Sequence, residues 1–174
     1  MPEQKGLVQV YTGDGKGKTT AAIGCGLRAS GHGLGVLIIQ FMKGREYGEL
    51  NALRQIPSFT IIQSGRDSFV SRENPSPEDR KLARDGFEKA RNAVLSGDYD
   101  LVILDEINVA VDFGLIGVDE VISLIEKKPE RLELILTGRN AHARIVELAD
   151  LVSEMKEVKH HYRKGIPARK GIEF

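Results

Sequence analysis

Residues suited to phosphate chemistry cluster near the start of the chain, in the stretch VQVYTGDGKGKTTAAIG that begins at Val8. An apolar run leads into three alternating glycines, a Lys-Thr pair and small helix-forming residues. Backbone amides at such a turn and helix start can face an anion, lysine adds positive charge, and a threonine hydroxyl suits Mg²⁺. The stretch predicts a phosphate-binding loop, with Lys18 and Thr19 as catalytic candidates. The nucleotide-binding residues that it predicts are Thr12, Gly13, Asp14, Gly15, Lys16, Gly17, Lys18, Thr19 and Thr20.

The spacing of this loop departs from the Walker A pattern G-x-x-x-x-G-K-[ST]. Counting back from Gly17, the pattern requires a glycine where the chain has Thr12, and the nearest glycine, Gly13, comes one residue late. A shorter loop shifts the phosphate cradle relative to the helix. Transfer of the γ-phosphoryl group therefore does not follow automatically from triphosphate binding.

A second group of candidates lies in YDLVILDEINVA, where four apolar residues lead directly into Asp105 and Glu106. A strand that ends in acids resembles a Walker B strand, whose Asp holds Mg²⁺ directly or through water. The predicted metal ligands are Thr19, Asp105 and Glu106. Glu106 is also a candidate base, and Asn108 offers hydrogen bonds at the same edge. The alternative is a strand that simply ends in solvent-exposed acids.

A third group follows the apolar run in LILTGRNAH and comprises Thr137, Arg139, Asn140 and His142. The guanidinium of Arg139 is suited to a phosphate or a carboxylate. Thr137 and Asn140 have an equally good alternative role as caps of the following helix. For His142 we expect a structural role.

The elements that must position these residues alternate along the chain. Strand-length apolar runs occupy 7–10, 34–39, 59–62, 101–104, 132–136 and 151–152, and helical spacing occupies 20–29, 77–95, 118–126 and 143–149. Successive apolar positions favour strands buried on both faces of a mostly parallel sheet. We therefore expect one α/β domain, residues 1–174, with helices on both faces of the sheet and ligands at the carboxyl ends of its strands. Residues 65–75 predict a long exposed loop, and the basic tail from Val158 predicts a surface extension with a short strand.

Composition excludes several classes of protein. Hydrophobic residues make up 41% of the chain and charged residues 29%, which is typical of a folded domain. The 25 basic and 25 acidic residues cancel, so we expect neither nucleic-acid nor membrane partners. No membrane-spanning run or signal peptide is recognisable, which favours the cytoplasm. The single Cys25 is expected to be a small buried thiol.

Seven segments together resemble one family, and they cover nearly the whole chain in the right order: TGDGKGKTTAAIG, RASGHG, IQFMKG, VILDEIN, LTGRNAH, ADLVSEM and VKHHYRKGIPARKGIE. They are similar to the P-loop ATP:corrinoid adenosyltransferases of cobalamin biosynthesis and salvage. The resemblance implies a single-domain P-loop NTPase fold of the RecA-like kind. It also implies transfer of the 5′-deoxyadenosyl group of ATP to the Co(I) centre of a reduced corrinoid, with release of inorganic triphosphate.

The resemblance further implies cofactors, partners and residue roles. Mg²⁺, a flavoprotein or other reductant for cobalt, and a homodimer are expected. The family binds ATP in the reverse sense along its loop, in keeping with the irregular Walker A spacing. Matching motifs place 13–20 on the triphosphate, Arg28 of RASGHG on a phosphate, Glu106 and Asn108 near metal and nucleotide, and Arg139 in the TGR element. From its residue type alone, Arg28 would be a solvated helix residue.

Two departures from the family pattern concern the corrinoid. Many relatives have a longer N-terminal segment that folds over the corrinoid, whereas residues 1–6 precede the first predicted strand here. Many also carry a Phe-x-Trp pair after the glycine that Gly65 matches. This chain has no Trp and reads GRDSFVSREN, so Phe69 is the residue left to help displace the lower axial ligand of cobalt. The alternative for Phe69 is ordinary loop packing.

Three other functions use similar residues. A small-molecule kinase needs the same loop and acids but yields a diphosphate. A RecA-like ATPase would show salt-sensitive polynucleotide binding. A nucleotide sensor or corrinoid carrier would bind without turnover. The sequence does not distinguish complete cobalamin, cobinamide or an earlier intermediate as the substrate, and no residue clearly reads the nucleotide base.

Overall fold

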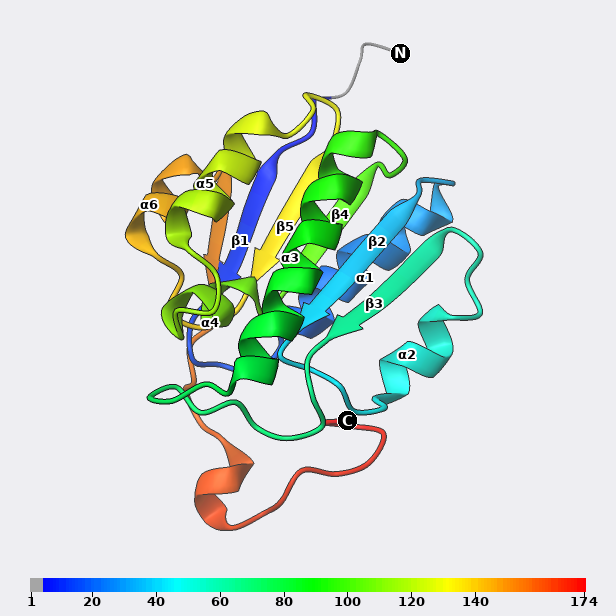
Figure 1. Cartoon of the computed structure of the whole chain (residues 1–174). Helices are drawn as coiled ribbons and strands as arrows, with labels where there is room; N and C mark the ends of the chain where they lie inside the picture. Colours follow the sequence, from blue (N-terminus) through cyan, green and yellow to red (C-terminus); the bar gives the residue numbers. More distant parts are fainter. Residues whose placement is uncertain (1–4) are drawn as a thin grey trace.

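One six-stranded sheet forms the centre of the protein, for which a computed structural model describes residues 5–174 (Figure 1). All neighbouring strands are parallel, in the order β3-β2-β4-β5-β1-β6, as the apolar runs predict. The strands are β1 (Val8–Thr12), β2 (Val36–Phe41), β3 (Phe59–Ser64), β4 (Leu101–Asp105), β5 (Glu133–Thr137) and β6 (Leu151–Glu154).

Helices cover both faces of this sheet. They are α1 (Lys18–Gly31), α2 (Gly48–Leu53), α3 (Pro77–Ser96), α4 (Ile107–Asp112), α5 (Val118–Lys127), α6 (Ala143–Leu148) and the 3₁₀ helix η1 (His161–Lys164). The four helices expected from the sequence are confirmed. The short helices α2, α4 and η1, of four to six residues each, were not predicted from the sequence.

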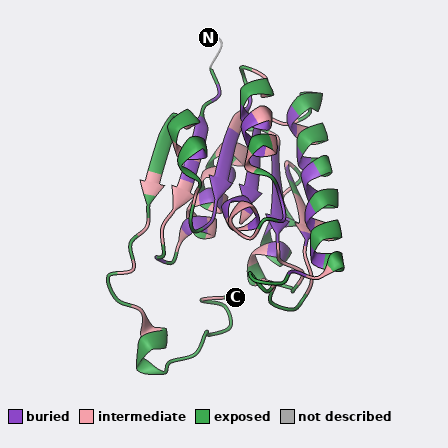
Figure 2. Cartoon of the chain, turned by 60° about the vertical axis from the view of Figure 1, so that its left-hand side comes forward, coloured by how far each residue is buried: buried purple, intermediate pink, exposed green. Residues whose placement is uncertain are grey.

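Burial on both faces explains the continuous apolar runs. In β2, Val36 and Ile38 belong to the core beneath α1, whereas Leu37 and Ile39 belong to the larger core beneath α3, α4 and α5. Side chains of a strand alternate between faces, so both sets must be apolar when both faces are covered. Strands β2 and β4 are accordingly buried along their whole length (Figure 2).

The loop 65–75 is exposed, as predicted, and is fixed to the fold at the start of α3. Ser76 caps this helix, because its hydroxyl accepts from the Asp79 amide while the Asp79 carboxylate accepts from the Ser76 amide. Arg66 donates to both Asp79 oxygens, at 2.8 and 3.0 Å. Burial alone would raise the pKa of Asp79, but the hydrogen bonds from Arg66 and Ser76 lower it below its ordinary value. This cluster anchors the loop that carries Phe69.

The chain after β6 differs from expectation. It contains η1 and no strand between residues 155 and 174, so the predicted short strand is wrong. The segment crosses the carboxyl ends of the strands and returns toward α2, where the chain ends (Figure 1). It is mostly exposed because it packs on the sheet edge rather than into either core (Figure 2).

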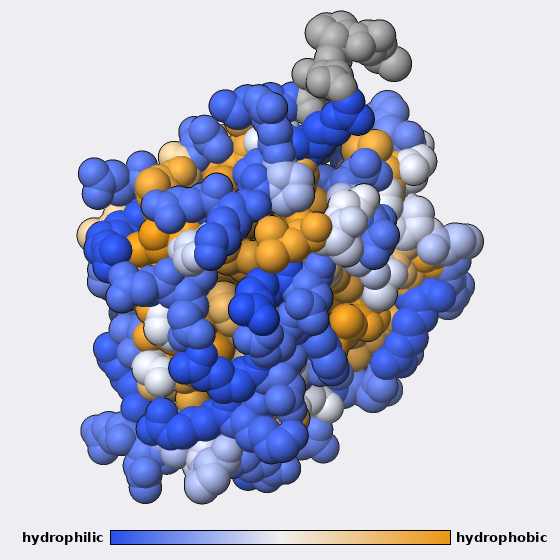
Figure 3. All heavy atoms as spheres, turned by 45° about the horizontal axis from the view of Figure 1, so that its top comes forward, coloured by the Kyte–Doolittle hydropathy of each residue, from blue (hydrophilic) through white to orange (hydrophobic). Residues whose placement is uncertain are grey.

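The face seen in Figure 3 is mainly hydrophilic, with hydrophobic residues in separate small patches. Among residues 5–174, no helix combines the length and apolar character needed to cross a bilayer. Cys25, expected to be buried, is half-buried on α1, and this burial raises the pKa of its thiol. A thiol with a raised pKa is a poor nucleophile at neutral pH.

Candidate active site

The predicted phosphate loop connects β1 to α1. Its structure shows why the glycine spacing departs from the Walker A pattern. Thr12 is the last residue of β1 and lies opposite Glu154 of β6, so the turn begins only at Gly13. Gly13 has a φ of 92°, and a Cβ there would overlap the Met155 carbonyl oxygen. The Gly15 amide donates to the same carbonyl over 2.6 Å. The first glycine of the Walker pattern is displaced because pairing with β6 extends the strand by one residue.

The Lys18 side chain packs against the inner side of this loop. Its ammonium donates to the carbonyl oxygens of Gly13 and Gly15, each at 2.7 Å, and the residue is only 8% exposed. Burial lowers the pKa of Lys18, although the Glu106 carboxylate opposes this effect. The ammonium thus lies beneath the loop that is expected to hold a triphosphate.

Asp105, at the end of β4, is fully buried and accepts hydrogen bonds from four other parts of the chain. The hydroxyls of Thr19 and Thr137 donate to its Oδ1 at 2.8 and 2.7 Å. The Gln40 amide and the Lys43 ammonium donate to its Oδ2 at 3.3 and 2.7 Å. The prediction that Asp105 ends a strand at the loop is confirmed, whereas the solvent-exposed alternative is wrong for this residue.

Thr137 and Asn140, at and after the end of β5, do not cap the following helix α6. Thr137 also accepts from the Glu106 amide at 3.0 Å, so it supports the acidic strand end rather than a helix. The cap of α6 is instead His142, whose Nδ1 accepts from the Arg144 amide, which confirms the expected structural role. Asn140 donates to Asp112 at 2.9 Å.

Glu106 occupies a strained position between β4 and α4. Its φ is 64°, in the left-handed region, which is uncommon for a residue with a side chain and often marks functional sites. Burial raises the pKa of its carboxyl, and the neighbouring Asp105 charge adds to the effect, while Lys43 and Lys18 oppose it. Glu106 therefore faces the site as a carboxyl group whose charge is costly without a cation nearby.

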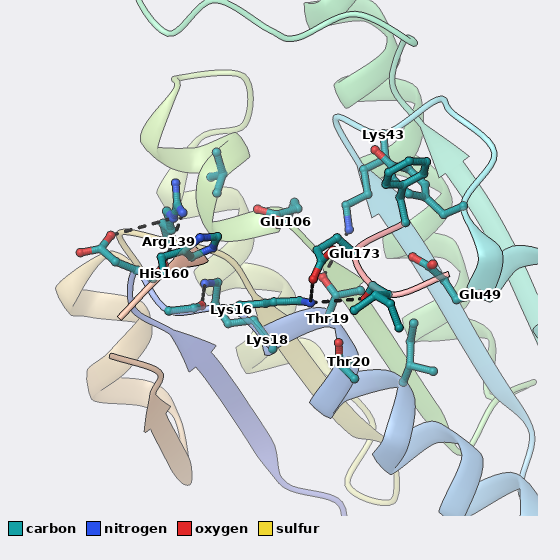
Figure 4. Close-up of a pocket in the computed structure, with 18 of the residues that line it drawn as sticks. Lys16, Lys18, Thr19, Thr20, Lys43, Glu49, Glu106, Arg139, His160 and Glu173 are labelled. Carbon is teal, nitrogen blue, oxygen red and sulfur yellow. Dashed lines mark hydrogen bonds and ion pairs between the residues drawn. The ribbon is translucent and has the colours of Figure 1, made fainter. Parts of the chain in front are cut away.

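A cavity of about 870 Å³ covers the loop at the carboxyl ends of the strands. Figure 4 shows Lys18, Thr19, Lys43 and Glu106 directed toward this shared space. Its volume is of the size that small-molecule ligands occupy. Of the predicted site residues, the cavity is lined by Asp14, Gly15, Lys16, Gly17, Lys18, Thr19, Thr20, Glu106 and Arg139.

Three of the predicted nucleotide contacts lie outside this cavity. Arg28 lies in the last turn of α1, about three turns from the loop, and does not line the cavity. Asn108 is fully buried in the first turn of α4, and neither polar atom of its side chain has a hydrogen-bond partner among the described residues. The Asn108 side chain lies near Gly138 and does not line the cavity. Thr12 does not line the cavity either, and its hydroxyl accepts from the Ala141 amide.

A second cavity, of about 290 Å³, adjoins the first. It lies beneath the anchored loop that carries Phe69, whose ring is 95% exposed and 5.8 Å from the Arg45 guanidinium. The structure thus places Phe69 beside the smaller cavity, away from the phosphate loop. Residues common to both cavities are Lys43, Tyr47, Glu106, Val109 and Phe113.

Among the contributors to the larger cavity that were not predicted from the sequence, two bear on the charge around the phosphate loop. One is Lys43, two residues beyond the end of β2; the polar residues after a buried strand were the available signal, since the same rule found Asp105 and Arg139. The other is the chain terminus, where Glu173 pairs with Lys16 at 3.0 Å. Hydrogen bonds from Arg169, with a smaller contribution from Lys16, hold the pKa of Glu173 well below its ordinary value. No local pattern predicts a contact between residues 157 positions apart.

The side chains at Asp105 and Thr19 offer oxygen atoms that could bind Mg²⁺. Among residues 5–174, no three His, Cys, Asp or Glu side chains form a metal-binding cluster, so the protein alone does not provide a complete site. However, the Thr19 hydroxyl and the Asp105 and Glu106 carboxyls are oxygen donors of the kind Mg²⁺ prefers, and oxygens of a bound triphosphate would complete its coordination. The residues fit a metal that arrives with a nucleotide, provided that the Lys43 ammonium moves away.

Comparisons with known proteins identify the family of the chain. Residues 4–174 match the family model described as ATP:corrinoid adenosyltransferase BtuR/CobO/CobP. The corrinoid adenosyltransferase of Escherichia coli K12 is 36% identical over 173 residues, covering 99% of this chain and 87% of that protein. Corrinoid adenosyltransferase CobA of Salmonella typhimurium has the same identity and coverage. An uncharacterised protein of Nostoc sp. is 41% identical over 169 residues, 89% of this chain, but this chain spans only 45% of its length.

The fold also has a counterpart among solved structures. The crystal structure of the RadB recombinase superposes with a TM-score of 0.56 at 11% identity, covering 90% of this chain and 77% of that one. At that identity the likeness shows the fold alone. It confirms the expected RecA-like P-loop NTPase architecture.

Proposed function

Because the chain belongs to the ATP:corrinoid adenosyltransferase family, we propose that it transfers the 5′-deoxyadenosyl group of ATP to the Co(I) centre of a reduced corrinoid and releases inorganic triphosphate. It is an enzyme of adenosyl transfer to corrinoids, in cobalamin biosynthesis or salvage. The resemblance found in the sequence and the family match lead to the same reaction. The finer assignments below are proposals that rest on the geometry of the site.

The observation that carries this proposal is the junction of the two cavities. One cavity contains the phosphate loop, and the other lies beneath the Phe69 loop among apolar groups that include Val109 and Phe113. A triphosphate on the loop and one face of a corrinoid in the smaller cavity would bring the ribose and the cobalt to their common boundary. A kinase for a small polar substrate has no need of an apolar second cavity at this position.

The reaction is a nucleophilic displacement at carbon. Cobalt attacks the ribose C5′, the C5′–O bond breaks, and its electron pair leaves with the triphosphate. Stabilisation of that leaving group is assigned to Lys16, Lys18 and the loop amides, and Arg139 also lines the cavity. No proton is removed in this step, so Glu106 is assigned to charge balance and the metal shell rather than to base catalysis. The remaining contribution of the protein is to hold C5′ and cobalt in line.

Mg²⁺ is assigned to the Thr19 hydroxyl, with Asp105 and Glu106 beside it. When bound with the nucleotide, it supplies electrostatic stabilisation of the leaving triphosphate. The chain's own part is to orient Thr19, and the hydrogen bond from that hydroxyl to Asp105 does so. We further propose that Phe69 contacts the lower face of the corrinoid and assists displacement of the axial ligand, a role that the missing Trp leaves to this residue.

We also propose that residues 1–174 form one catalytic domain, and that it works in the cytoplasm as a homodimer which receives electrons for cobalt from a flavoprotein or another reductant. The single continuous sheet supports the domain assignment. The family resemblance supports the dimer and the reductant. Residues 1–4 of the short N-terminal segment lie outside the described residues. The expectation that nucleic acid and membranes are not partners rests on the balanced charge of the chain.

An anaerobic assay tests the reaction. Purified protein is mixed with MgATP and chemically reduced cob(I)alamin, while the corrinoid spectrum is followed and the phosphate product is identified. A light-sensitive alkylcobalamin formed with one triphosphate per turnover is expected. Formation of ADP would indicate a kinase or motor ATPase, and binding of both ligands without turnover would indicate a sensor or carrier.

A further inference from the structure

Lys43 lies where a P-loop protein holds its divalent cation. Its ammonium is 2.7 Å from Asp105 Oδ2 and 3.3 Å from the Thr19 hydroxyl oxygen. These two groups are the ones that the loop and the acidic strand end offer to Mg²⁺. Figure 4 shows the Lys43 side chain reaching from the end of β2 into the space above Thr19. In this protein one cation already occupies the position that a second cation would need.

The surroundings of Lys43 favour an ion pair that is stable in this state. Asp105 is fully buried, and only 18% of the Lys43 side chain is exposed. The Lys43 ammonium and the Asp105 carboxylate are 2.7 Å apart and compensate each other's charge in this partly buried position. The preceding residue, Met42, has a φ of 58°, and such left-handed strain in a residue with a side chain is often retained for function.

Simultaneous binding of the ammonium and a divalent ion at these oxygens is unfavourable, because like charges at contact distance repel strongly in a partly buried site. Lys43 lines both cavities, so its flexible stem can carry the charge from Asp105 toward the nucleotide cavity. A bound triphosphate provides an anion there. The exchange replaces one cation beside Asp105 by another and keeps the buried carboxylate compensated throughout.

We propose that Lys43 is a positioning residue that substitutes for the divalent cation when no nucleotide is bound and moves onto the triphosphate when the metal and nucleotide enter together. The protein without nucleotide therefore excludes the free metal ion. This inference rests on the proposed function only in assigning the metal to Thr19 and Asp105. The competing view is a permanent Lys43–Asp105 ion pair that never yields to a metal.

The test uses Mn²⁺ alone as the probe, measured by the loss of the free-ion electron paramagnetic resonance signal, on the full chain without nucleotide. Lys43→Met removes the charge and retains an unbranched side chain. We expect one Mn²⁺ per chain in Lys43→Met, with an affinity at least about tenfold higher than that of the unaltered protein. Adding Asp105→Asn to Lys43→Met should abolish the new site.

A matched control is Lys81→Met. Lys81 also pairs with an Asp over 2.7 Å, but on the surface of α3 with 74% of its side chain exposed. It should leave Mn²⁺ binding unchanged. Lys43→Gln provides a second variant if Lys43→Met fails to fold by circular dichroism, and it should gain the same site.

The outcomes that overturn the proposal are equal Mn²⁺ binding by the unaltered protein and the Lys43 variants, or a folded Lys43 variant that gains no site. Adenosyl transfer is assayed separately on the unaltered protein. If that assay succeeds while the Mn²⁺ result is negative, only the role of Lys43 is wrong. If Mn²⁺ binds as expected but no adenosyl transfer occurs, the proposed reaction is wrong and the role of Lys43 stands.

Discussion

The hydroxyl of Thr19 donates a 2.8 Å hydrogen bond to the carboxylate of Asp105, which lies 86 residues further along the chain. This bond joins the start of α1 to the end of β4, and therefore the phosphate loop to the acidic strand end. Thr137 completes the junction by donating to the same oxygen from β5. The central part of the site is thus one hydrogen-bonded unit in which the phosphate loop and the ends of β4 and β5 are oriented together.

Lys18→Ala is expected to reduce adenosyl transfer by about 10²- to 10³-fold, because it removes a buried cation from the leaving triphosphate. It also leaves the Gly13 and Gly15 carbonyls without their shared donor. Turnover and ATP affinity should be measured together. Lys81→Ala, which removes an exposed lysine of α3, is the control and should match the unaltered protein; comparable rates for both variants would remove Lys18 from the mechanism.

Gly13→Ala is expected to destabilise the protein by about 2 kcal/mol or more, since the residue has a φ of 92° and the new methyl group would overlap the Met155 carbonyl. Gly24→Ala is the opposite case. Gly24 lies within α1 with no atom in the way of a Cβ, so alanine should raise stability by about 0.5 to 1 kcal/mol. Urea unfolding measures both; a shift of the same sign in the two variants would contradict the loop geometry.

Asp79→Ala is expected to cost about 2 kcal/mol of stability at neutral pH, because it removes the α3 cap and the anchor of Arg66. The folded-state pKa of Asp79 lies below its ordinary value. Its contribution is therefore fully present above the unfolded pKa of about 3.9 and is lost as pH falls through the folded value. Unfolding curves of the two proteins should converge in acid. A difference that persists unchanged at low pH would show that the charge is not responsible.

Phe69→Ala is expected to weaken corrinoid binding by about three- to tenfold while ATP affinity and stability stay unchanged. The ring is exposed and borders only the smaller cavity, so its loss disturbs neither core. Val158→Ala is the control, because Val158 is another exposed apolar residue, 87% accessible, that lines neither cavity. Corrinoid titration in the presence of ATP distinguishes them. Equal corrinoid affinity in both variants would show that Phe69 does not contact the corrinoid.

The sequence by itself determined the succession along the chain of the six strands and of α1, α3, α5 and α6, and the residues at three strand ends. Runs of apolar residues require burial on both faces, and parallel strands bring their carboxyl ends to one edge, so Lys18, Asp105 and Arg139 were predictable from local pattern. The motifs also identified the family. These signals are local, because each depends on residues close together in the chain.

Only the tertiary structure decided which of those side chains meet. The burial of Asn108 and the distance of Arg28 from the loop follow from helix phase and length, which depend on where α4 and α1 begin. The pairing of Thr12 with β6 set the length of the loop. Glu173 reached the site because the chain after β6 folds back across the carboxyl ends of the strands (Figure 1). Contacts of this kind arise from packing between distant segments, and no periodicity within a segment records them.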